Sequence, residues 1–232
     1  MRLQDTKKNW NEFADSDPMS AILTEKANWN QKEFFETGSK EISELLEKTK
    51  QIHFERGRAL DFGCGLGRLS RALADHFEQV IGVDISKRMI DLAIQYNDDC
   101  KNCKFYLNET ADLKAFEDDY FDLIYSARTL QHIEPEYSKN YLIEFLRILS
   151  PNGLLVFQLP SERQGVKRFM QKGIHATNSV RTKISSGPVM EMYGIRQDEV
   201  KALILKEKGK LIKIEDSTNA PGWTDFFYYV TK

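Results

Sequence analysis

Three glycines, Gly63, Gly65 and Gly67, stand two residues apart between a short apolar segment and a segment with helical apolar spacing. Glycine has no Cβ, so such a turn can adopt left-handed backbone dihedrals and lets a ligand lie directly against the main chain. The helix that follows directs its unpaired N–H groups and its positive dipole end toward the same place. This arrangement suits a nucleotide-like ligand that carries a carboxylate or a phosphate.

A glycine-rich turn is a weak signal on its own, because a tight turn without any ligand has the same composition. The next apolar segment, residues 79–84, ends in an acid, Asp84. In a strand–helix–strand unit, an acid at the tip of the second strand reaches the ribose hydroxyls of a bound nucleoside. The two features at this separation favour a nucleoside-containing cofactor over a ligand-free turn.

The spacing of the glycines separates two classes of cofactor. Dinucleotide binding needs the pattern Gly-x-Gly-x-x-Gly, whose third glycine allows close helix packing. In this chain Arg68 fills the third position, which disfavours an NAD-type dinucleotide-binding oxidoreductase. The pattern Gly-x-Gly-x-Gly instead resembles motif I of the class I S-adenosylmethionine-dependent methyltransferases, in which the loop wraps the methionine part of the cofactor.

Further segments resemble the same family, in the same order along the chain. Residues 83–89 resemble its ribose-binding segment, residues 108–113 its adenine-binding segment, and residues 121–126 its fourth strand. Residues 149–157 are similar to the family's L-x-P-G-G approach to strand five, with Asn152 in place of the first glycine. Asparagine tolerates left-handed dihedrals better than other non-glycine residues, so the turn stays feasible.

This resemblance implies S-adenosylmethionine as the cofactor and a set of residues around it. It leaves open whether Glu109 or Asp112 faces the adenine base. The implied cofactor-binding residues are Asp61, Gly63, Cys64, Gly65, Gly67, Arg68, Asp84, Ile85, Met89, Glu109, Asp112, Leu113, Ser126 and Gln131.

Methyl transfer asks little of side chains, because the sulfonium methyl is already activated and the protein mainly aligns the nucleophile and excludes water. An alcohol nucleophile must also lose a proton, which requires a base. His132, just after the fourth strand, is the only histidine that motif position puts near the methyl donor. It is a candidate general base, or alternatively a wall or capping residue of the cofactor pocket. Tyr125 and Gln131 border the same pocket and could orient the acceptor.

Strand and helix patterns alternate after residue 57, which predicts a parallel sheet covered on both faces. Apolar residues also recur at helical spacing within residues 30–52, which predicts a helix packed on the sheet. The resemblance implies a Rossmann-like α/β fold with a mostly parallel, seven-stranded sheet in the order 3-2-1-4-5-7-6, its last strand antiparallel. The predicted strands are 58–62, 79–84, 103–107, 121–126, 153–159, 210–215 and 225–231.

Residues 1–29 lie outside this pattern and contain several aromatic residues, among them Trp10 and Phe13. They resemble an N-terminal lid of bacterial small-molecule methyltransferases, including ones from glycan gene clusters, in which Trp10 would contact the acceptor. The alternative is a helix that packs on the core through its aromatic side chains. The chain would thus divide into residues 1–56, with the helical lid and the first sheet-packing helix, and a methyltransferase core at 57–232.

A second segment outside the core pattern, residues 160–195, is a basic insertion after strand five. It lies beyond the carboxyl end of a central strand, where open α/β sheets bind ligands. Arg163 and Arg168 are therefore candidates for binding an anionic group of the acceptor, such as a phosphate. A solvated basic face is the alternative. Against the one acid Glu162, the cations of residues 160–187 are Arg163, Lys167, Arg168, Lys172, Arg181 and Lys183.

The composition fits a single domain with a sizeable core, since the chain has 232 residues of which 41% are hydrophobic. A formal net charge of −2 gives no overall attraction to nucleic acid or to an anionic membrane. We see no apolar run near the roughly 20 residues that span a bilayer, and no apolar core of a signal peptide at the N-terminus. We therefore expect a cytoplasmic protein without nucleic-acid or membrane partners, and leave its oligomeric state open.

Three cysteines cannot form a disulfide framework, which suits a reducing compartment. Cys100 and Cys103 form one Cys-x-x-Cys pair, which is half of a zinc site, but no second pair or His-x-His cluster completes it. We expect no metal. Cys64 is expected to serve as a small residue in the cofactor loop.

Together these features predict an S-adenosylmethionine-dependent methyltransferase that acts on a small molecule, first of all on a hydroxyl of a sugar or other metabolite. A phosphorylated or nucleotide-linked sugar ranks ahead of a carboxylated metabolite, because of the basic segment. Two alternatives stay open: an NAD-type dinucleotide-binding oxidoreductase, and a protein of the same fold that binds S-adenosylmethionine without catalysis.

Overall fold

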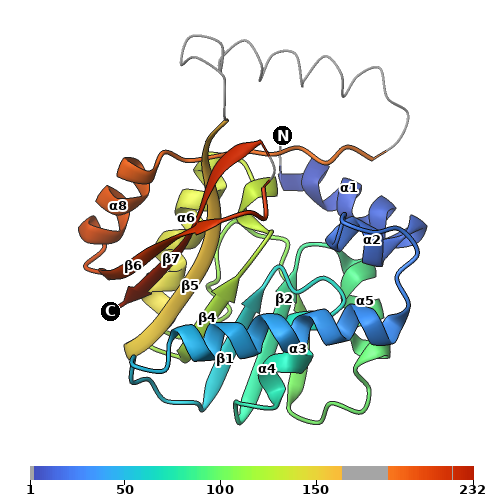
Figure 1. Ribbon diagram of the computed structural model, residues 1–232, viewed down its shortest axis with the longest axis horizontal. Helices are drawn as coiled ribbons and strands as arrows, with labels where there is room; N and C mark the ends of the chain where they lie inside the picture. The colour runs from blue at the N-terminus through green and yellow to red at the C-terminus, as the bar shows by residue number, and fades with distance from the viewer. Residues whose placement is uncertain (1–2, 164–187, 221) are drawn as a thin grey trace.

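The computed structural model of the protein describes residues 3–163, 188–220 and 222–232 (Figure 1). Over these residues the chain forms one seven-stranded sheet. The strands, in the order in which they pair, are β3 (Cys103–Leu107), β2 (Gln79–Asp84), β1 (Arg58–Phe62), β4 (Phe121–Ser126), β5 (Leu149–Arg163), β7 (Trp223–Thr231) and β6 (Lys210–Ser217). β7 runs antiparallel to β5 and β6, and the other pairs are parallel. The predicted strand order and antiparallel last strand are confirmed.

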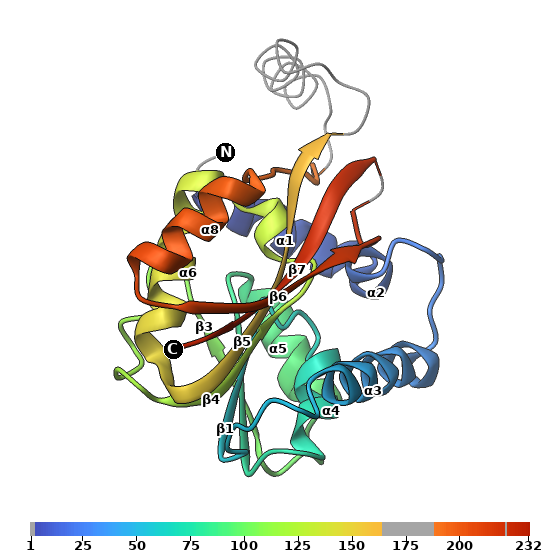
Figure 2. The ribbon, with the colours of Figure 1, turned by 60° about the vertical axis from the view of Figure 1, so that its left-hand side comes forward.

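Helices cover both faces of this sheet, as Figure 2 shows. The helices are α1 (Leu3–Ser16), α2 (Pro18–Ile22), α3 (Gln31–Lys48), α4 (Arg68–Ala74), α5 (Lys87–Tyr96), α6 (Pro135–Ile148) and α8 (Gln197–Lys206). α3 and α4 lie on one face, and α6 and α8 lie on the other. α1 and α2 lie across the end of the sheet at which the parallel strands finish (Figure 1).

Local sequence signals explain where several helices begin. Asn30 caps α3, its side chain accepting a hydrogen bond from the Glu33 N–H at 2.9 Å. Ser86 caps α5 in the same way, accepting from the Met89 N–H at 3.1 Å. Pro18 occupies the first turn of α2, where its fixed φ suits a helix and its missing N–H is not needed. The caps satisfy N–H groups that have no partner within the helix.

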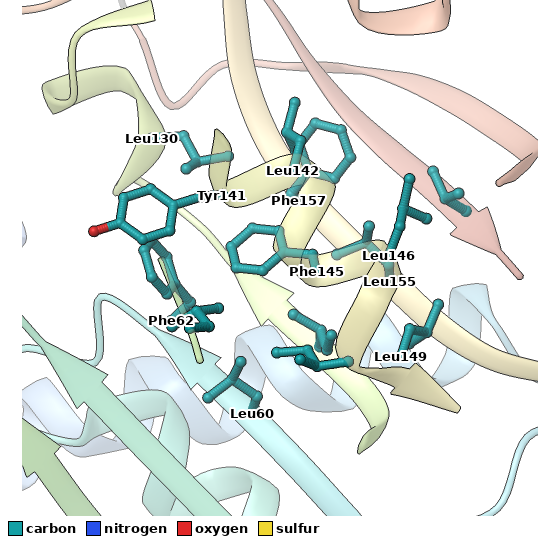
Figure 3. Close-up of a cluster of buried hydrophobic side chains, with 14 of the residues drawn as sticks. Leu60, Phe62, Leu130, Tyr141, Leu142, Phe145, Leu146, Leu149, Leu155 and Phe157 are labelled. Carbon is teal, nitrogen blue, oxygen red and sulfur yellow. The ribbon is translucent and has the colours of Figure 1, made fainter. Parts of the chain in front are cut away.

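Hydrophobic clusters lie on both faces of the sheet, and a third lies beneath α1 and α2. On the α6 face, the ring of Phe62 packs against those of Tyr141 and Phe145 with centroid distances of 4.6 and 4.9 Å (Figure 3). The third cluster joins Phe34 of α3 to Met89 of α5. Phe62 is the last residue of β1, and Met89 follows the end of β2 by five residues. The packing of these two side chains therefore holds the carboxyl ends of β1 and β2 in place.

β5 is longer than predicted at both ends. It begins at Leu149 rather than at residue 153, and it continues to Arg163, which pairs with Trp223 of β7. The first residues of the predicted insertion at 160–195 therefore belong to the sheet. Asn152 has a φ of 63°, the left-handed conformation that the sequence predicts for it, and the register between β4 and β5 shifts at this turn.

α3 packs against α4 and contributes Ile42 and Leu45 to the hydrophobic cluster on its face of the sheet. The first sheet-packing helix thus shares its core with the strands, and the predicted division of the chain at residue 56 stays a prediction. Within the described residues, none of the helices combines the length and the apolar character that crossing a membrane requires.

Candidate functional site

A cavity of about 1120 Å³, including its open mouth, lies at the carboxyl ends of β1, β2 and β4. Open α/β sheets bind ligands at this end, and the size suits a small-molecule site. α1, α2 and the extended stretch 188–195 (orange in Figure 1) border it. Eight of the residues that the sequence analysis singled out line this cavity: Trp10, Gly63, Gly65, Asp84, Ile85, Met89, Gln131 and His132.

The glycine loop forms one wall of the cavity with bare backbone. Gly63, Gly65 and Gly67 have φ values of 77°, 51° and 78°, in the region that L side chains rarely adopt. The Gly63 N–H donates to the Val83 carbonyl at 2.8 Å, which ties the loop to the end of β2. A Cβ at Gly63 would lie 2.2 Å from the side chain of Thr129, so the loop also needs glycine for close packing.

Asp84 joins the glycine loop to the start of α5. Its Oδ2 accepts a hydrogen bond from the Gly65 N–H at 3.0 Å, and its Oδ1 accepts from the Ser86 N–H at 2.8 Å. Burial raises the pKa of this carboxyl, and the backbone N–H groups of Ser86, Gly65 and Ile85 oppose that rise. A carboxylate has about four lone-pair directions. Two are used here, and the others can receive a pair of ligand hydroxyls.

The predicted adenine end of the site differs from expectation. Glu109 forms an ion pair with Lys7 of α1, and Asp112 lies 2.9 Å from Lys114, so each predicted acid has a surface partner. Neither lines the cavity; Asn108, which directly follows β3, does. Which of the two acids faces the base therefore stays open, since neither lines the cavity in this structure. The position of Asn108 at a strand end is the signal that could have identified it.

Leu113 is buried, and its N–H donates to Glu144 Oε2 at 2.8 Å instead of facing the cavity. Ser126 is also buried, and its hydroxyl donates to the Phe62 carbonyl at 3.2 Å. Both residues were expected at the cofactor. They hold neighbouring segments together and do not line the cavity.

Asp61, Cys64 and Gly67 likewise support the loop from behind. Asp61 accepts a hydrogen bond from Ser70 Oγ of α4 at 2.6 Å, and burial raises its pKa to about 6. Burial also raises the pKa of the Cys64 thiol, which makes it a poor nucleophile. Gly67 precedes α4, and a Cβ there would lie 2.8 Å from the Phe105 ring. None of the three lines the cavity, and that they contact the cofactor stays a prediction.

Arg68 and Tyr125 point away from the cavity, toward α3. Glu41 of α3 accepts hydrogen bonds from Arg68 Nη2, Arg128 Nη1 and the Tyr125 hydroxyl, each at 2.9 Å. Burial alone would raise the pKa of Glu41, but the two guanidinium groups lower it to about 2. Neither Arg68 nor Tyr125 lines the cavity, so a contact of Arg68 with the cofactor and a role of Tyr125 toward the acceptor stay predictions. Arg128, which the sequence analysis missed, does line it.

His132 and Gln131 lie where the sequence predicts, on the turn after β4. His132 Nδ1 lies 2.7 Å from the Glu191 carbonyl, and its Nε2 lies 3.0 Å from Gln131 Nε2. A carbonyl can only accept, so the proton of the ring is on Nδ1. Burial lowers the pKa of His132 to about 4, against a smaller opposing effect of the Glu191 carbonyl. The imidazole is therefore neutral near pH 7, with a lone pair on Nε2.

α1 is fastened over the cavity by its own hydrogen bonds. Asn11 Oδ1 accepts from Ser86 Oγ at 2.8 Å and from the Arg88 N–H at 3.1 Å, at the start of α5. The Trp10 ring lies edge-on to His132 with a centroid distance of 5.4 Å, and Phe13 packs against Trp10. The helix thus packs through its aromatic residues and also brings Trp10 to the cavity. That the segment is a lid whose Trp10 contacts the acceptor stays a prediction.

The stretch 188–195, the end of the predicted insertion at 160–195, supplies a wall of the cavity through residues that the sequence analysis did not name. Met190 and Met192 line the cavity. The Tyr193 N–H donates to the Gln131 carbonyl at 2.7 Å, and Asn9 Nδ2 of α1 donates to the Val189 carbonyl at 3.0 Å. No local sequence motif predicts that this stretch lines the cavity, because its contacts are made with residues more than fifty positions away in the sequence.

Arg163 does not line the cavity. Its guanidinium lies 5.8 Å from the ring centroid of Trp223, on the neighbouring strand. Arg168 lies outside the described residues, as do Lys167, Lys172, Arg181 and Lys183. Of the predicted cationic acceptor site, the structure therefore describes only Arg163, and places it elsewhere.

Cys100 and Cys103 are bonded to each other at the start of β3. Over the part of the chain that the structure describes, no group of three or more His, Cys, Asp or Glu side chains is placed to hold a metal ion. That the protein needs no metal stays a prediction.

Residues 60–157 match a family model described as a methyltransferase domain. The chain is 29% identical over 135 residues to a ubiquinone biosynthesis O-methyltransferase of Cereibacter sphaeroides, over 53% of this chain and 54% of that protein. It is 30% identical over 118 residues to phosphoethanolamine N-methyltransferase 1 of Zea mays, over 50% of this chain and 23% of that protein. The chain thus spans about half the length of the first relative and less of the second.

Two solved structures share the fold over nearly the whole chain. Magnesium protoporphyrin IX methyltransferase from Synechocystis PCC 6803, with bound S-adenosylhomocysteine, has a TM-score of 0.65 at 14% identity, over 98% of this chain and 99% of that one. A SAM-dependent methyltransferase from Leishmania major has a TM-score of 0.68 at 13% identity, over 99% and 82%. At sequence identities of 13–14%, the similarity to these structures establishes a shared fold.

Proposed function

We propose that this protein, whose residues 60–157 match the methyltransferase-domain model, is a class I S-adenosylmethionine-dependent methyltransferase that transfers a methyl group to a hydroxyl of a small molecule. One observation carries the proposal: Gly63, Gly65 and Asp84 line the same cavity as Gln131 and His132. The glycine backbone and the Asp84 carboxylate, which suit the cofactor, thus line the same cavity as the neutral imidazole of His132, which can take up a proton.

The cofactor-binding half of the cavity fits this assignment. Asp84 has lone pairs left for the two ribose hydroxyls after its hydrogen bonds to the Gly65 and Ser86 N–H groups. Ile85 and Met89 offer apolar surface for a base. When bound, S-adenosylmethionine supplies a methyl group activated by the sulfonium. The protein's own contribution is to orient the acceptor, exclude water and receive the proton.

Replacing Gly65 by valine should abolish most cofactor binding. A Cβ at this position would lie 2.6 Å from Ile22 Cδ1 in the cavity wall, and a φ of 51° strains any L side chain. Gly222→Val is the matched control, because Gly222 has a φ of 80° but, among the described residues other than its chain neighbours, no atom lies within 4 Å of its Cβ position. Both variants carry backbone strain of about 1–3 kcal/mol. In calorimetry with S-adenosylhomocysteine, only Gly65→Val should lose affinity; equal affinity of the two variants would contradict the placement.

The acceptor half of the cavity has largely apolar walls. Trp10, Ile133, Met190 and Met192 surround the side of the cavity where His132 lies. Such walls favour an acceptor that presents an apolar face beside its hydroxyl, as an aromatic ring or one face of a sugar does. Arg163 lies elsewhere, and Arg128, which does line the cavity, is already paired with Glu41 at 2.9 Å. The anionic character of the acceptor stays a prediction.

A hydroxyl acceptor is favoured by the state of His132. Methyl transfer to an alcohol leaves a strongly acidic oxonium, and a neutral imidazole accepts its proton even with a pKa near 4. An amine acceptor, by contrast, needs no base in the site once it is unprotonated. Our proposal that the methyl acceptor is a hydroxyl oxygen and not an amine therefore depends on the buried, neutral imidazole of His132.

The rate of methyl transfer should be independent of pH from about pH 6 to 8 and fall below about pH 5. The reason is that His132 must be neutral to accept the proton, and its pKa is about 4 instead of the usual 6.5. kcat/KM measured from pH 3.5 to 8 tests this. His132→Gln should lose the acid limb together with most activity, whereas His76→Gln, at an exposed position after α4, should behave as wild type. An acid limb centred near pH 6.5 would contradict the assignment of the base.

Turnover distinguishes the proposal from a protein that binds S-adenosylmethionine without catalysis. The purified protein would be incubated with S-adenosylmethionine labelled on its methyl group and with phenols, sugars, sugar phosphates and amines. We expect label in a neutral hydroxyl compound with an apolar face. Cofactor binding without transfer to any of these classes would favour the non-catalytic alternative, and transfer only to amines would overturn the choice of oxygen.

A further inference from the structure

Behind His132, a chain of hydrogen-bonded side chains runs into the interior of the sheet. Gln158 of β5 is fully buried, and Asp225 of β7 is 3% exposed. Gln158 Nε2 donates to Asp225 Oδ1 at 2.6 Å and to Gln131 Oε1 at 3.1 Å. Gln131 and His132 line the cavity, whereas Gln158 and Asp225 do not. Burying an amide and a carboxyl among core residues costs free energy unless they are hydrogen-bonded. We therefore ask what the hydrogen bonds of Gln158 and Asp225 do for the cavity.

The orientation of the Gln158 amide is fixed from two sides. Its Oε1 accepts from the Arg128 N–H at 2.8 Å, and a backbone N–H can only donate. Its Nε2 is therefore turned toward Asp225, which accepts. The remaining hydrogen on Nε2 is directed to Gln131, and an amide nitrogen can only donate, so Gln131 must present its oxygen.

The orientation of the Gln131 amide in turn determines which nitrogen of His132 carries the proton. With its oxygen on Gln158, Gln131 turns its Nε2 toward His132 Nε2, 3.0 Å away. An amide N–H needs an acceptor, so His132 Nε2 must carry a lone pair and no hydrogen. On the other side of the ring, the Glu191 carbonyl requires the proton on Nδ1. Two independent constraints thus select the same tautomer.

We propose that Gln158 and Asp225 are positioning residues for methyl transfer: through Gln131 they hold His132 in the tautomer whose Nε2 lone pair can accept the acceptor's proton. The inference rests on the proposed function for its chemistry. The acceptor hydroxyl replaces the Gln131 N–H as the donor to Nε2. As the oxygen–methyl bond forms, the sulfur–methyl bond breaks and its electron pair stays on sulfur, and the hydroxyl proton passes to Nε2. The products are the methyl ether, S-adenosylhomocysteine and an imidazolium that later releases the proton to water.

The test substitution is Gln158→Met, which keeps the length and approximate volume of the side chain and removes its polar atoms. Gln131 is then free to turn its amide and offer its oxygen to His132 Nε2. The state of the His132 ring is read from its ¹⁵N chemical shifts at pH 7.5 with S-adenosylhomocysteine bound, assigned by comparison with His132→Gln. We expect one Nδ1–H tautomer in the wild type. In Gln158→Met we expect a measurable fraction of the Nε2–H tautomer, limited by the Glu191 carbonyl, which still favours the proton on Nδ1.

In kinetics, Gln158→Met should lower kcat by about 10- to 100-fold, a part of what a general base contributes. The KM for the acceptor and the affinity for S-adenosylhomocysteine should change less than about twofold, because Gln158 does not line the cavity. Tyr228→Phe is the matched control: Tyr228 is fully buried on β7, and its hydroxyl makes no hydrogen bond to the described residues, so ring shifts and kcat should stay near wild type. Gln158→Leu serves as the test should the methionine variant not fold.

Wild-type ring shifts together with wild-type kcat in a folded Gln158 variant would overturn the proposal. So would an equal loss in Tyr228→Phe, since that would point to the packing of the sheet and not to the hydrogen bonds of Gln158. The ¹⁵N measurement needs no acceptor. If no acceptor of any class is turned over, the proposed function fails while the tautomer experiment still decides whether the chain positions His132.

Discussion

Replacing Asp84 by alanine should weaken the binding of S-adenosylhomocysteine by about 1.5–3 kcal/mol, the range for hydrogen bonds to a charged group. The carboxylate is the one acidic group at the end of β2 that lines the cavity, and it also accepts the Gly65 and Ser86 N–H groups. Its loss therefore leaves the ribose hydroxyls unpaired and loosens the glycine loop. Isothermal titration calorimetry measures the change directly.

Asp91→Ala is the matched control for this substitution. Asp91 lies on α5 and pairs with Lys87 at 2.7 Å on the exposed side of the helix, away from the cavity. Asp91→Ala should leave the affinity for S-adenosylhomocysteine unchanged. Asp84→Asn should lie between the two, because one side-chain oxygen is retained. Wild-type affinity in Asp84→Ala would rule out this residue as the ribose ligand.

Replacing Glu41 by alanine should lower the free energy of unfolding by about 3–5 kcal/mol, the cost of breaking a buried ion pair from one side. The substitution leaves the guanidinium of Arg68, which is 4% exposed, without its ion-pair partner, and removes the acceptor of Arg128 and Tyr125. Urea unfolding checks this. Glu44→Ala on the same helix, whose partner Lys40 is mostly exposed, should change stability by less than about 0.5 kcal/mol.

The effect of Glu41 should also depend on pH in a definite direction. Its pKa is about 2 in the folded protein against a usual 4.5, so the unfolded chain binds the proton more tightly. The stability that Glu41 contributes is complete above about pH 4.5 and declines as the pH falls toward 2. The stability difference between wild type and Glu41→Ala should therefore shrink below pH 4.5. A difference that is constant from pH 6 to 3.5 would contradict the ion-pair explanation.

The fold could be predicted from the sequence because its signals are local. β1 and β2 are apolar runs that end at the glycine loop and at Asp84, and their bounds match the prediction. Asn152 adopts the left-handed φ that its residue type allows. The strand order came from the family resemblance, and the sheet confirms it.

The direction of individual side chains was harder to predict. Asp61 was expected at the cofactor, but successive side chains of a strand point to opposite faces. Phe62 lines the cavity, so Asp61 faces α4 and bonds to Ser70. Tyr125 lies on the α3 face for the same reason. This alternation was readable in the sequence once Phe62 was placed.

Other parts of the site could not be predicted because they depend on distant contacts. Arg68 follows the glycine loop, yet its charge is held by Glu41, 27 residues earlier. Met190 and Met192 reach the cavity only because the stretch 188–195 is bonded to Gln131 and to α1. Such pairings come from tertiary packing and carry no local pattern.

A crystal structure of the protein with S-adenosylhomocysteine would test the central claim most directly. We predict that the ligand lies in the cavity between the glycine loop and Met89, with both ribose hydroxyls within hydrogen-bond distance of the Asp84 carboxylate and its sulfur on the side of His132. Density for the ligand at another place, or a ribose that does not contact Asp84, would contradict the assignment of this site.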